Sequence, residues 1–112
     1  MSSFVGSSDI GFELSREFAG FPWTNPENYE KCSPKTYFKN VKTPVLIIHS
    51  EQDLRCPAEQ AEQMFVMLKV LGKKVEMVRF PEEPHGLSRH GRPDRRVARL
   101  EWMRKWFDRY LK

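Results

Sequence analysis

The sequence predicts an α/β fold in which parallel strands pack against helices. Two short runs, at residues 44–49 and 75–80, are rich in β-branched and apolar residues. Each run is followed by a segment with apolar residues at helical spacing. Because the order strand, helix, strand, helix is typical of parallel strands joined by a crossover helix, we expect residues 43–112 to form one such unit.

The region before the first strand, residues 1–42, is predicted to hold only loops and short helices. Glycine and proline interrupt it at Gly6, Gly11, Gly20, Pro22, Pro26 and Pro34. These residues break regular structure, so no long element fits between them. Asn25 before Pro26, and Ser33 before Pro34, each place a capping residue ahead of a proline, which predicts two helix starts.

The first strand and the helix after it are read from their apolar patterns. Residues 44–49 lack the alternation of a half-exposed strand, which predicts burial on both faces. Pro57 begins the following helix, and Gly72 ends it. Its predicted core-facing stripe is Ala61, Met64, Phe65, Leu68 and Leu71.

The second strand, residues 75–80, leads through a loop rich in proline, glycine and histidine to a long helix that begins at Pro93. Its predicted apolar face is Val97, Leu100, Met103, Phe107, Tyr110 and Leu111. Trp102 and Trp106, four residues apart, are expected to be packing groups. We expect the basic residues of this helix to form its solvated face. They are Arg95, Arg96, Arg99, Arg104, Lys105 and Arg109. Since no nucleic-acid-binding motif accompanies them, the net charge of +4 does not predict nucleic-acid binding.

Composition narrows the class of protein further. No run approaches the roughly 18 apolar residues that cross a bilayer, and the first residues lack the pattern of a signal peptide. We therefore expect a cytoplasmic protein with no membrane partner. Cys32 and Cys56 are expected to be reduced thiols. His49, His85 and His90 lack the short fixed spacing of a metal site, so no metal is expected.

The candidate catalytic residues are Asp53 and His85, which follow the two strands and are separated by 85 − 53 = 32 residues. Parallel strands place their following loops at the same sheet edge, so the two side chains are expected to meet there. Each also has a simpler interpretation, because Asp53 could cap the next helix and His85 could be a turn residue. His49 is expected to be a packed or hydrogen-bonded core histidine, and His90 to be exposed.

Several segments resemble the prolyl oligopeptidase family, especially its acylaminoacyl-peptidase branch. They are residues 43–49, residues 53–57 with Gln60, His85-Gly86-Leu87-Ser88, Gly91-Arg92-Pro93 with Arg96, and upstream residues 8–11, 20–23 and 33–34. The resemblance implies that residues 1–112 are the C-terminal part of an α/β-hydrolase catalytic domain. It further implies a serine peptidase that cleaves short or N-acylated peptides without a cofactor. In it Asp53 orients His85, and His85 acts as general base and then general acid.

One part of the family pattern is missing, because no Gly-x-Ser-x-Gly nucleophile elbow occurs in the chain. Ser7 and Ser8 lie between Gly6 and Gly11, which are one position too far apart and follow no apolar strand. The chain alone is therefore expected to be inactive, to need the missing N-terminal part of the domain, and to self-associate through its incomplete sheet. The alternative is a non-catalytic interaction or regulatory module on a hydrolase scaffold.

Overall fold

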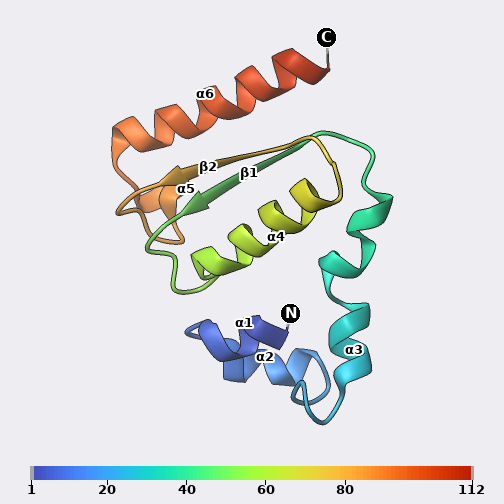
Figure 1. The fold of residues 1–112 in the computed structure, drawn as a ribbon. Coiled ribbons are helices and arrows are strands. Elements are labelled where there is room, and N and C mark those ends of the chain that lie inside the picture. Colours follow the sequence, from blue (N-terminus) through green and yellow to red (C-terminus); the bar gives the residue numbers. More distant parts are fainter. Residues whose placement is uncertain (1, 112) are drawn as a thin grey trace.

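Two parallel strands, β1 (Val45–Ser50) and β2 (Val75–Phe80), form the sheet, with Val45 opposite Val75 and Ser50 opposite Phe80. The computed structural model describes residues 2–111. Helix α4 (Ala58–Val70) connects the strands and covers one face of the sheet, while α6 (Pro93–Tyr110) lies on the other face (Figure 1). The predicted parallel strand-helix-strand-helix unit is thereby confirmed.

Shorter elements complete the chain. They are α1 (Ser2–Ser7), α2 (Gly11–Glu17), α3 (Pro26–Lys31), the 3-10 helix η1 (Pro34–Asn40) and α5 (Leu87–His90). The two proline-led helix starts are confirmed as α3 and η1. The side chain of Asn25 does not cap α3, however. Its amide instead donates to the backbone carbonyls of Phe18 and Ala19, because the chain turns back on itself there. No helix within residues 2–111 is both long and apolar enough to cross a membrane.

The core lies between α4 and the sheet. Its buried members are Phe38, Ile47, Ala61, Leu68 and Val75. Leu68 is completely buried, which confirms the predicted inner face of α4. Full burial of such a side chain stabilises the fold by about 1.5–3 kcal/mol. Leu71, predicted on the same stripe, lies past the end of the helix and is 46% exposed.

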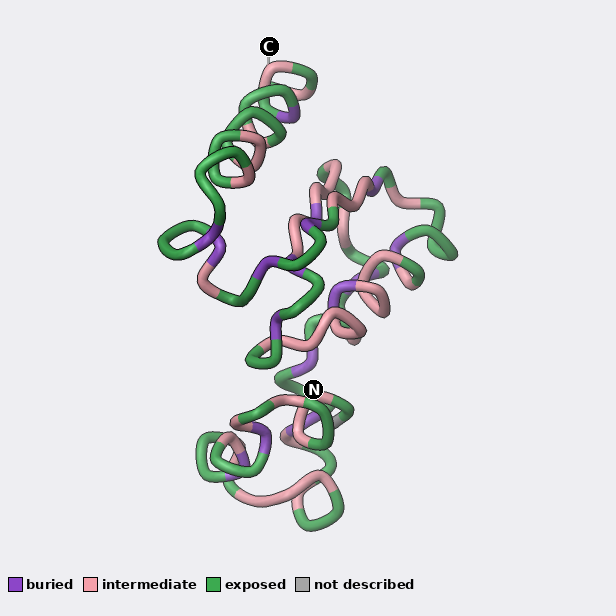
Figure 2. The backbone as a smooth tube through the Cα atoms, turned by 90° about the vertical axis from the view of Figure 1, so that its left-hand side faces the viewer, coloured by how far each residue is buried: buried purple, intermediate pink, exposed green. Residues whose placement is uncertain are grey.

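The apolar residues predicted along one face of α6 are largely uncovered in this chain. Val97, Leu100 and Phe107 are each more than half exposed, and Leu111 is 75% exposed. Trp106 is the buried residue of α6 within the described chain. Figure 2 shows exposed positions along most of α6. The reason is that a sheet of two strands is too narrow to cover a helix of 18 residues.

Strand β1 is likewise less buried than predicted. Only Ile47 and Ser50 are fully buried, and its other residues are half-buried. Because β2 pairs with one edge of β1, the other edge has no strand beside it within residues 2–111. An apolar groove lies between β1 and α6. Its lining residues are Pro44, Val45, Leu46, Ile48, Met103, Trp106 and Phe107.

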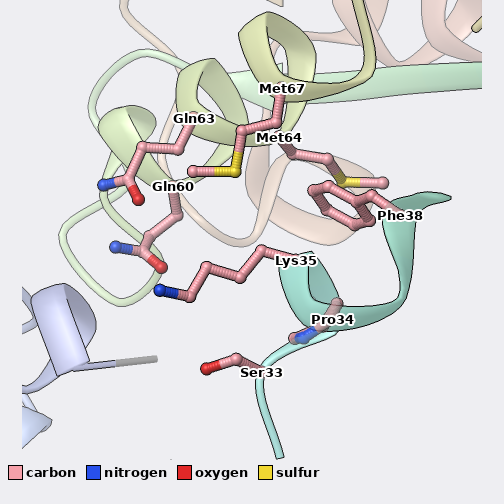
Figure 3. A pocket seen from close by; sticks show the side chains of 8 residues that line it. All are labelled: Ser33, Pro34, Lys35, Phe38, Gln60, Gln63, Met64 and Met67. Carbon is pink, nitrogen blue, oxygen red and sulfur yellow. The ribbon is translucent and has the colours of Figure 1, made fainter. Parts of the chain in front are cut away.

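A second hollow lies between η1 and α4 (Figure 3). Phe38 and Met64 form its apolar wall, and Lys35, Gln60 and Gln63 line its open side. None of its lining residues is one of the candidate catalytic residues. The candidate catalytic residues follow the ends of β1 and β2.

Candidate active site

The loops after β1 and β2 are held together by backbone hydrogen bonds beyond the last strand pair. The Glu51 amide donates to the Phe80 carbonyl at 3.0 Å, and the Gln52 amide donates to the Glu83 carbonyl at 3.0 Å. Asp53 is the residue directly after Gln52, and His85 lies two residues after Glu83. The parallel register thus extends into the loops and brings the two candidate residues to one sheet edge.

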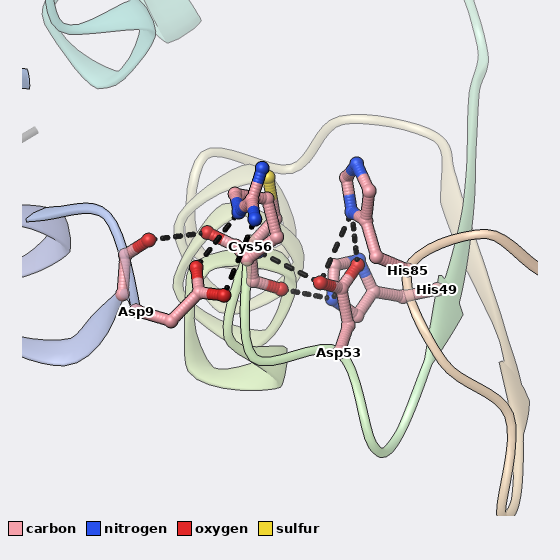
Figure 4. Close-up of polar contacts among 7 residues, drawn as sticks. Asp9, His49, Asp53, Cys56 and His85 are labelled. Carbon is pink, nitrogen blue, oxygen red and sulfur yellow. Dashed lines mark hydrogen bonds and ion pairs between the residues drawn. The ribbon is translucent and has the colours of Figure 1, made fainter.

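Asp53 and His85 are in direct contact. The Nδ1 atom of His85 lies 2.9 Å from Oδ2 and 3.0 Å from Oδ1 of Asp53. Since a carboxylate only accepts, Nδ1–H is the donor. Asp53 is 7% exposed, whereas the side chain of His85 is 54% exposed and its other ring nitrogen points away from the carboxylate (Figure 4). The predicted meeting of these two groups is confirmed.

Asp53 also organises its own loop. Its Oδ1 atom accepts a hydrogen bond from the Cys56 amide at 2.8 Å, three residues later. The first position before α4 is Pro57, which lies beyond this turn, so the carboxylate caps the turn and not the helix. The interpretation of Asp53 as a cap of the next helix was therefore wrong, and the buried carboxylate instead caps the turn before α4 and contacts His85. Burial raises the pKa of the Cys56 thiol, and the charge of Asp53 raises it further.

His49 supports the same loop from the end of β1. Its Nε2 atom lies 2.8 Å from the Cys56 carbonyl and 3.9 Å from Oδ2 of Asp53. A carbonyl only accepts, so Nε2–H of His49 must be the donor. His49 and His85 thus require opposite neutral tautomers. The prediction of a hydrogen-bonded core histidine is confirmed, while its approach to Asp53 could not be read from the sequence. His90 is exposed, as predicted.

The N-terminal segment is fastened to the Asp53 loop through Arg55. Its guanidinium donates to both carboxylate oxygens of Asp9, at 2.8 and 3.4 Å. The Asp9 amide donates to the Leu54 carbonyl at 2.9 Å, and the Ser8 hydroxyl to the Arg55 carbonyl at 2.6 Å. The bond from Arg55 lowers the pKa of Asp9, and the same bond raises the pKa of Arg55. Residues 45 or more positions apart in the sequence are therefore joined at the candidate site.

Ser7 and Ser8, the two serines closest to a nucleophile motif, donate their hydroxyl protons to groups other than His85. The Ser8 hydroxyl bonds to the Arg55 carbonyl, as above, and the Ser7 hydroxyl contacts the Ser3 carbonyl and the Glu59 carboxylate. A hydroxyl has one proton to donate. Neither serine therefore offers that proton to His85.

A pocket of about 270 Å³ adjoins the pair, on the side of α6. Its wall includes Asp53 and His85 themselves, Leu87 and Ser88 from α5, and Arg99 from α6. The buried carboxylate fixes the imidazole so that Nε2 is left free to accept a proton in this open space. The arrangement can do the work of two members of a Ser-His-Asp triad.

Parallel strands that place a carboxylate and a histidine beyond consecutive strand ends define the chain as part of an α/β-hydrolase fold. The sequence model of the prolyl oligopeptidase family matches residues 1–112. The chain belongs to the prolyl oligopeptidase family.

Individual relatives agree with this assignment. An uncharacterized peptidase of Bacillus subtilis, YuxL, is 46% identical over 97% of this chain. The uncomplexed acylaminoacyl peptidase of Pyrococcus horikoshii is 40% identical over 99% of the chain, with a TM-score of 0.91. An acylaminoacyl peptidase bound to Z-Gly-Gly-Phe-chloromethyl ketone is 41% identical over 98%, with a TM-score of 0.90. The chain spans 17% of the Bacillus protein and 18% of each solved chain.

Proposed function

We propose that this chain supplies the acid and the histidine of a serine-peptidase triad, Asp53 and His85, to a catalytic domain that also contains the nucleophilic serine. The observation that carries the proposal is the contact of 2.9 Å between the buried Asp53 carboxylate and Nδ1 of the half-exposed His85. Membership of the prolyl oligopeptidase family supports the same role.

In the proposed reaction His85 moves protons between serine, leaving group and water. Nε2 accepts the serine hydroxyl proton as the serine oxygen bonds to the substrate carbonyl carbon. The imidazolium, stabilised by Asp53, then gives this proton to the amide nitrogen as the C–N bond breaks. Water repeats the sequence on the acyl-enzyme, transferring its proton to Nε2 and its hydroxyl to the acyl carbon, and serine recovers the proton. No cofactor takes part in these steps.

The proposed substrates are short peptides, including those with an N-acylated first residue. The similarity to two acylaminoacyl peptidases supports this class, and so does the name peptidase carried by the Bacillus relative. The chain itself has no Gly-x-Ser-x-Gly elbow. We therefore expect the 112 residues alone to hydrolyse neither acyl esters nor N-acyl-amino-acid anilides.

A chimera tests the proposal. This chain replaces the matching segment of the Pyrococcus horikoshii acylaminoacyl peptidase, and hydrolysis of an N-acetyl-amino-acid p-nitroanilide is followed. We expect activity that falls by roughly 10⁴- to 10⁶-fold in His85→Ala. His90→Ala is the matched control, because His90 is an exposed histidine five residues away. A folded chimera that keeps its activity without His85 would favour the non-catalytic alternative, in which the scaffold serves only for interaction.

We also propose that the isolated chain associates with a second copy of itself. The unpaired edge of β1 and the apolar groove beside it support this, because exposed strand edges and apolar surfaces promote association. Phe107 lines the groove and is 52% exposed. Light scattering at micromolar concentration should report a dimer or larger species, and Phe107→Glu should shift it toward the monomer. A folded monomer in the unmodified chain contradicts the idea.

A further inference from the structure

Glu83 is a buried carboxylate in the loop that carries His85. Its exposed fraction is 2%, and it is one of the most deeply buried residues in the described part of the chain. Burial of a carboxylate is costly unless hydrogen bonds compensate. The neighbouring residue Glu82 is exposed, so a carboxylate at this point of the loop does not have to be buried. The position of Glu83 therefore needs an explanation.

Two hydrogen bonds of Glu83 enclose the His85 loop. At one end, the carbonyl of Glu83 accepts the Gln52 amide at 3.0 Å, directly before Asp53. At the other end, Oε1 of Glu83 accepts the Arg92 amide at 3.2 Å, directly before α6. The eight residues 84–91 lie between these two bonds. A single residue thus ties the His85 loop both to the Asp53 loop and to the start of α6.

The surroundings of Glu83 are shaped to receive its carboxylate. A side chain at Gly91 would place its first carbon 2.6 Å from Oε2 of Glu83 and 2.6 Å from a methyl of Leu87. Only glycine leaves this space open. The residue before Glu83, Glu82, has a φ of 63°, a left-handed backbone conformation that is uncommon for residues other than glycine. Backbone strain of this kind persists where the surrounding contacts hold it in place.

We propose that Glu83 is a positioning residue, whose carboxylate and carbonyl hold the His85 loop so that the imidazole stays bonded to Asp53. Its role rests on the proposed function, since Glu83 acts only through the Asp53–His85 pair. Without the carboxylate bond, the loop keeps its link to Gln52 but Glu83 no longer holds the Arg92 amide at the start of α6. His85, whose side chain is half exposed, is then free to turn away from Asp53.

The test removes the hydrogen bond from the partner's side and leaves Glu83 unchanged. Arg92 has a φ of −54°, and Gly91 before it has an extended ψ of 164°, so both positions accept proline at 92. Arg92→Pro deletes the amide hydrogen, and its ring presses on Oε1 of Glu83. Arg92→Ala is the matched control, because it removes only the side-chain ion pair with Asp94.

The readout is the ring nitrogen spectrum of the 112-residue chain labelled with ¹⁵N-histidine. With only three histidines, each ring can be assigned by substitution. In the unmodified chain and in Arg92→Ala, His85 should show the Nδ1–H form and His49 the Nε2–H form. In Arg92→Pro, we expect loss of the Nδ1–H signature of His85, while that of His49 stays. An unchanged His85 signature in Arg92→Pro overturns the proposal.

Substitution of Glu83 gives a second, independent measurement. Glu83→Gln keeps one acceptor oxygen and should preserve the His85 signature, whereas Glu83→Ala should lose it. Glu82→Gln, a change of the exposed neighbour, should have no effect. A Glu83→Ala chain that folds and retains the signature also overturns the proposal, and if this variant does not fold, the Arg92 pair decides.

The outcomes separate the two proposals. If the unmodified chain lacks the Nδ1–H form of His85, both fail. If the signature is present but indifferent to Arg92→Pro, only the role of Glu83 fails. If the variants behave as expected and the chimera is inactive, only the proposed catalytic function fails.

Discussion

Replacement of Asp53 separates its two roles, as a cap for the turn and as the partner of His85. Asp53→Asn keeps an oxygen that can accept the Cys56 amide, now 2.8 Å from Oδ1. Its new NH₂ group replaces Oδ2, which lies 2.9 Å from Nδ1 of His85, so two donors would meet there, while Oδ1, 3.0 Å from Nδ1, is shared with the Cys56 amide. We expect His85 then to take the opposite tautomer, with the proton on Nε2. That nitrogen can no longer accept a proton from serine.

The expected changes in kcat and in the free energy of unfolding follow from these contacts. In the chimera, Asp53→Asn should lower kcat by about 10⁴-fold, the size of effect expected from the wrong tautomer. Asp53→Ala leaves the Cys56 amide without its acceptor, which costs about 1–3 kcal/mol. The half-exposed bond to His85 adds roughly 0.5–1 kcal/mol. We therefore expect Asp53→Ala to destabilise the chain by roughly 1.5–4 kcal/mol, and Asp53→Asn by about 1 kcal/mol or less.

Two assays are needed, because stability and activity should respond differently. Urea unfolding of the 112-residue chain, followed by circular dichroism, measures the free energy of unfolding of each variant. Hydrolysis of the anilide by the chimera measures activity. Equal loss of stability in both variants would refute the assignment of Oδ1 as the cap. Near-normal activity in Asp53→Asn would refute the role of the carboxylate in setting the tautomer of His85.

The remaining predictions concern reactivity, acid stability and the core. Because burial and the nearby carboxylate raise the pKa of Cys56, iodoacetamide at pH 8 should modify it more slowly than the exposed Cys32, as measured by mass spectrometry of the peptides. The lowered pKa of Asp9 stabilises the fold above the ordinary carboxyl value of roughly 4, and this contribution is lost as the pH falls through the lowered folded value. Hydrogen exchange of the N-terminal amides should therefore accelerate in that acid range, and Arg55→Ala should produce the same acceleration at neutral pH; an unchanged exchange rate would contradict the attachment. Leu68→Ala should cost about 3–5 kcal/mol in urea unfolding, since the side chain is fully buried, and a loss below about 1 kcal/mol would show that the core can close around the gap.

Much of the site could be predicted from the sequence because the relevant signals are local. The apolar runs of β1 and β2 predict strands, and the apolar stripe that includes Leu68 predicts the inner face of α4, although Leu71, its last member, lies past the helix. Parallel topology then requires the loops after both strands to open at one edge. The contact between Asp53 and His85 followed from these steps, although each residue alone had a simpler interpretation.

Other features depended on contacts that no local pattern encodes. The apolar stripe of α6 has the periodicity of a buried face, yet Leu100 is 60% exposed, because the periodicity does not say how wide the sheet beneath the helix is. The buried state of Glu83 could not be distinguished from the exposed state of Glu82 by residue type. Nor could the pairing of Arg55 with Asp9, 46 positions away, be read from spacing.

The sequence by itself determined the α/β class, the order of the elements and the two residues that face each other at the strand ends. Periodicity and turn-forming residues act over a few positions and so remain visible in the chain. Only the tertiary structure decided that Asp53 also caps its own turn, that His49 holds the same loop, and that Glu83 ties the His85 loop to α6. These contacts depend on the paths that the loops take once the strands have paired, and those paths are set by packing and hydrogen bonding across the whole fold.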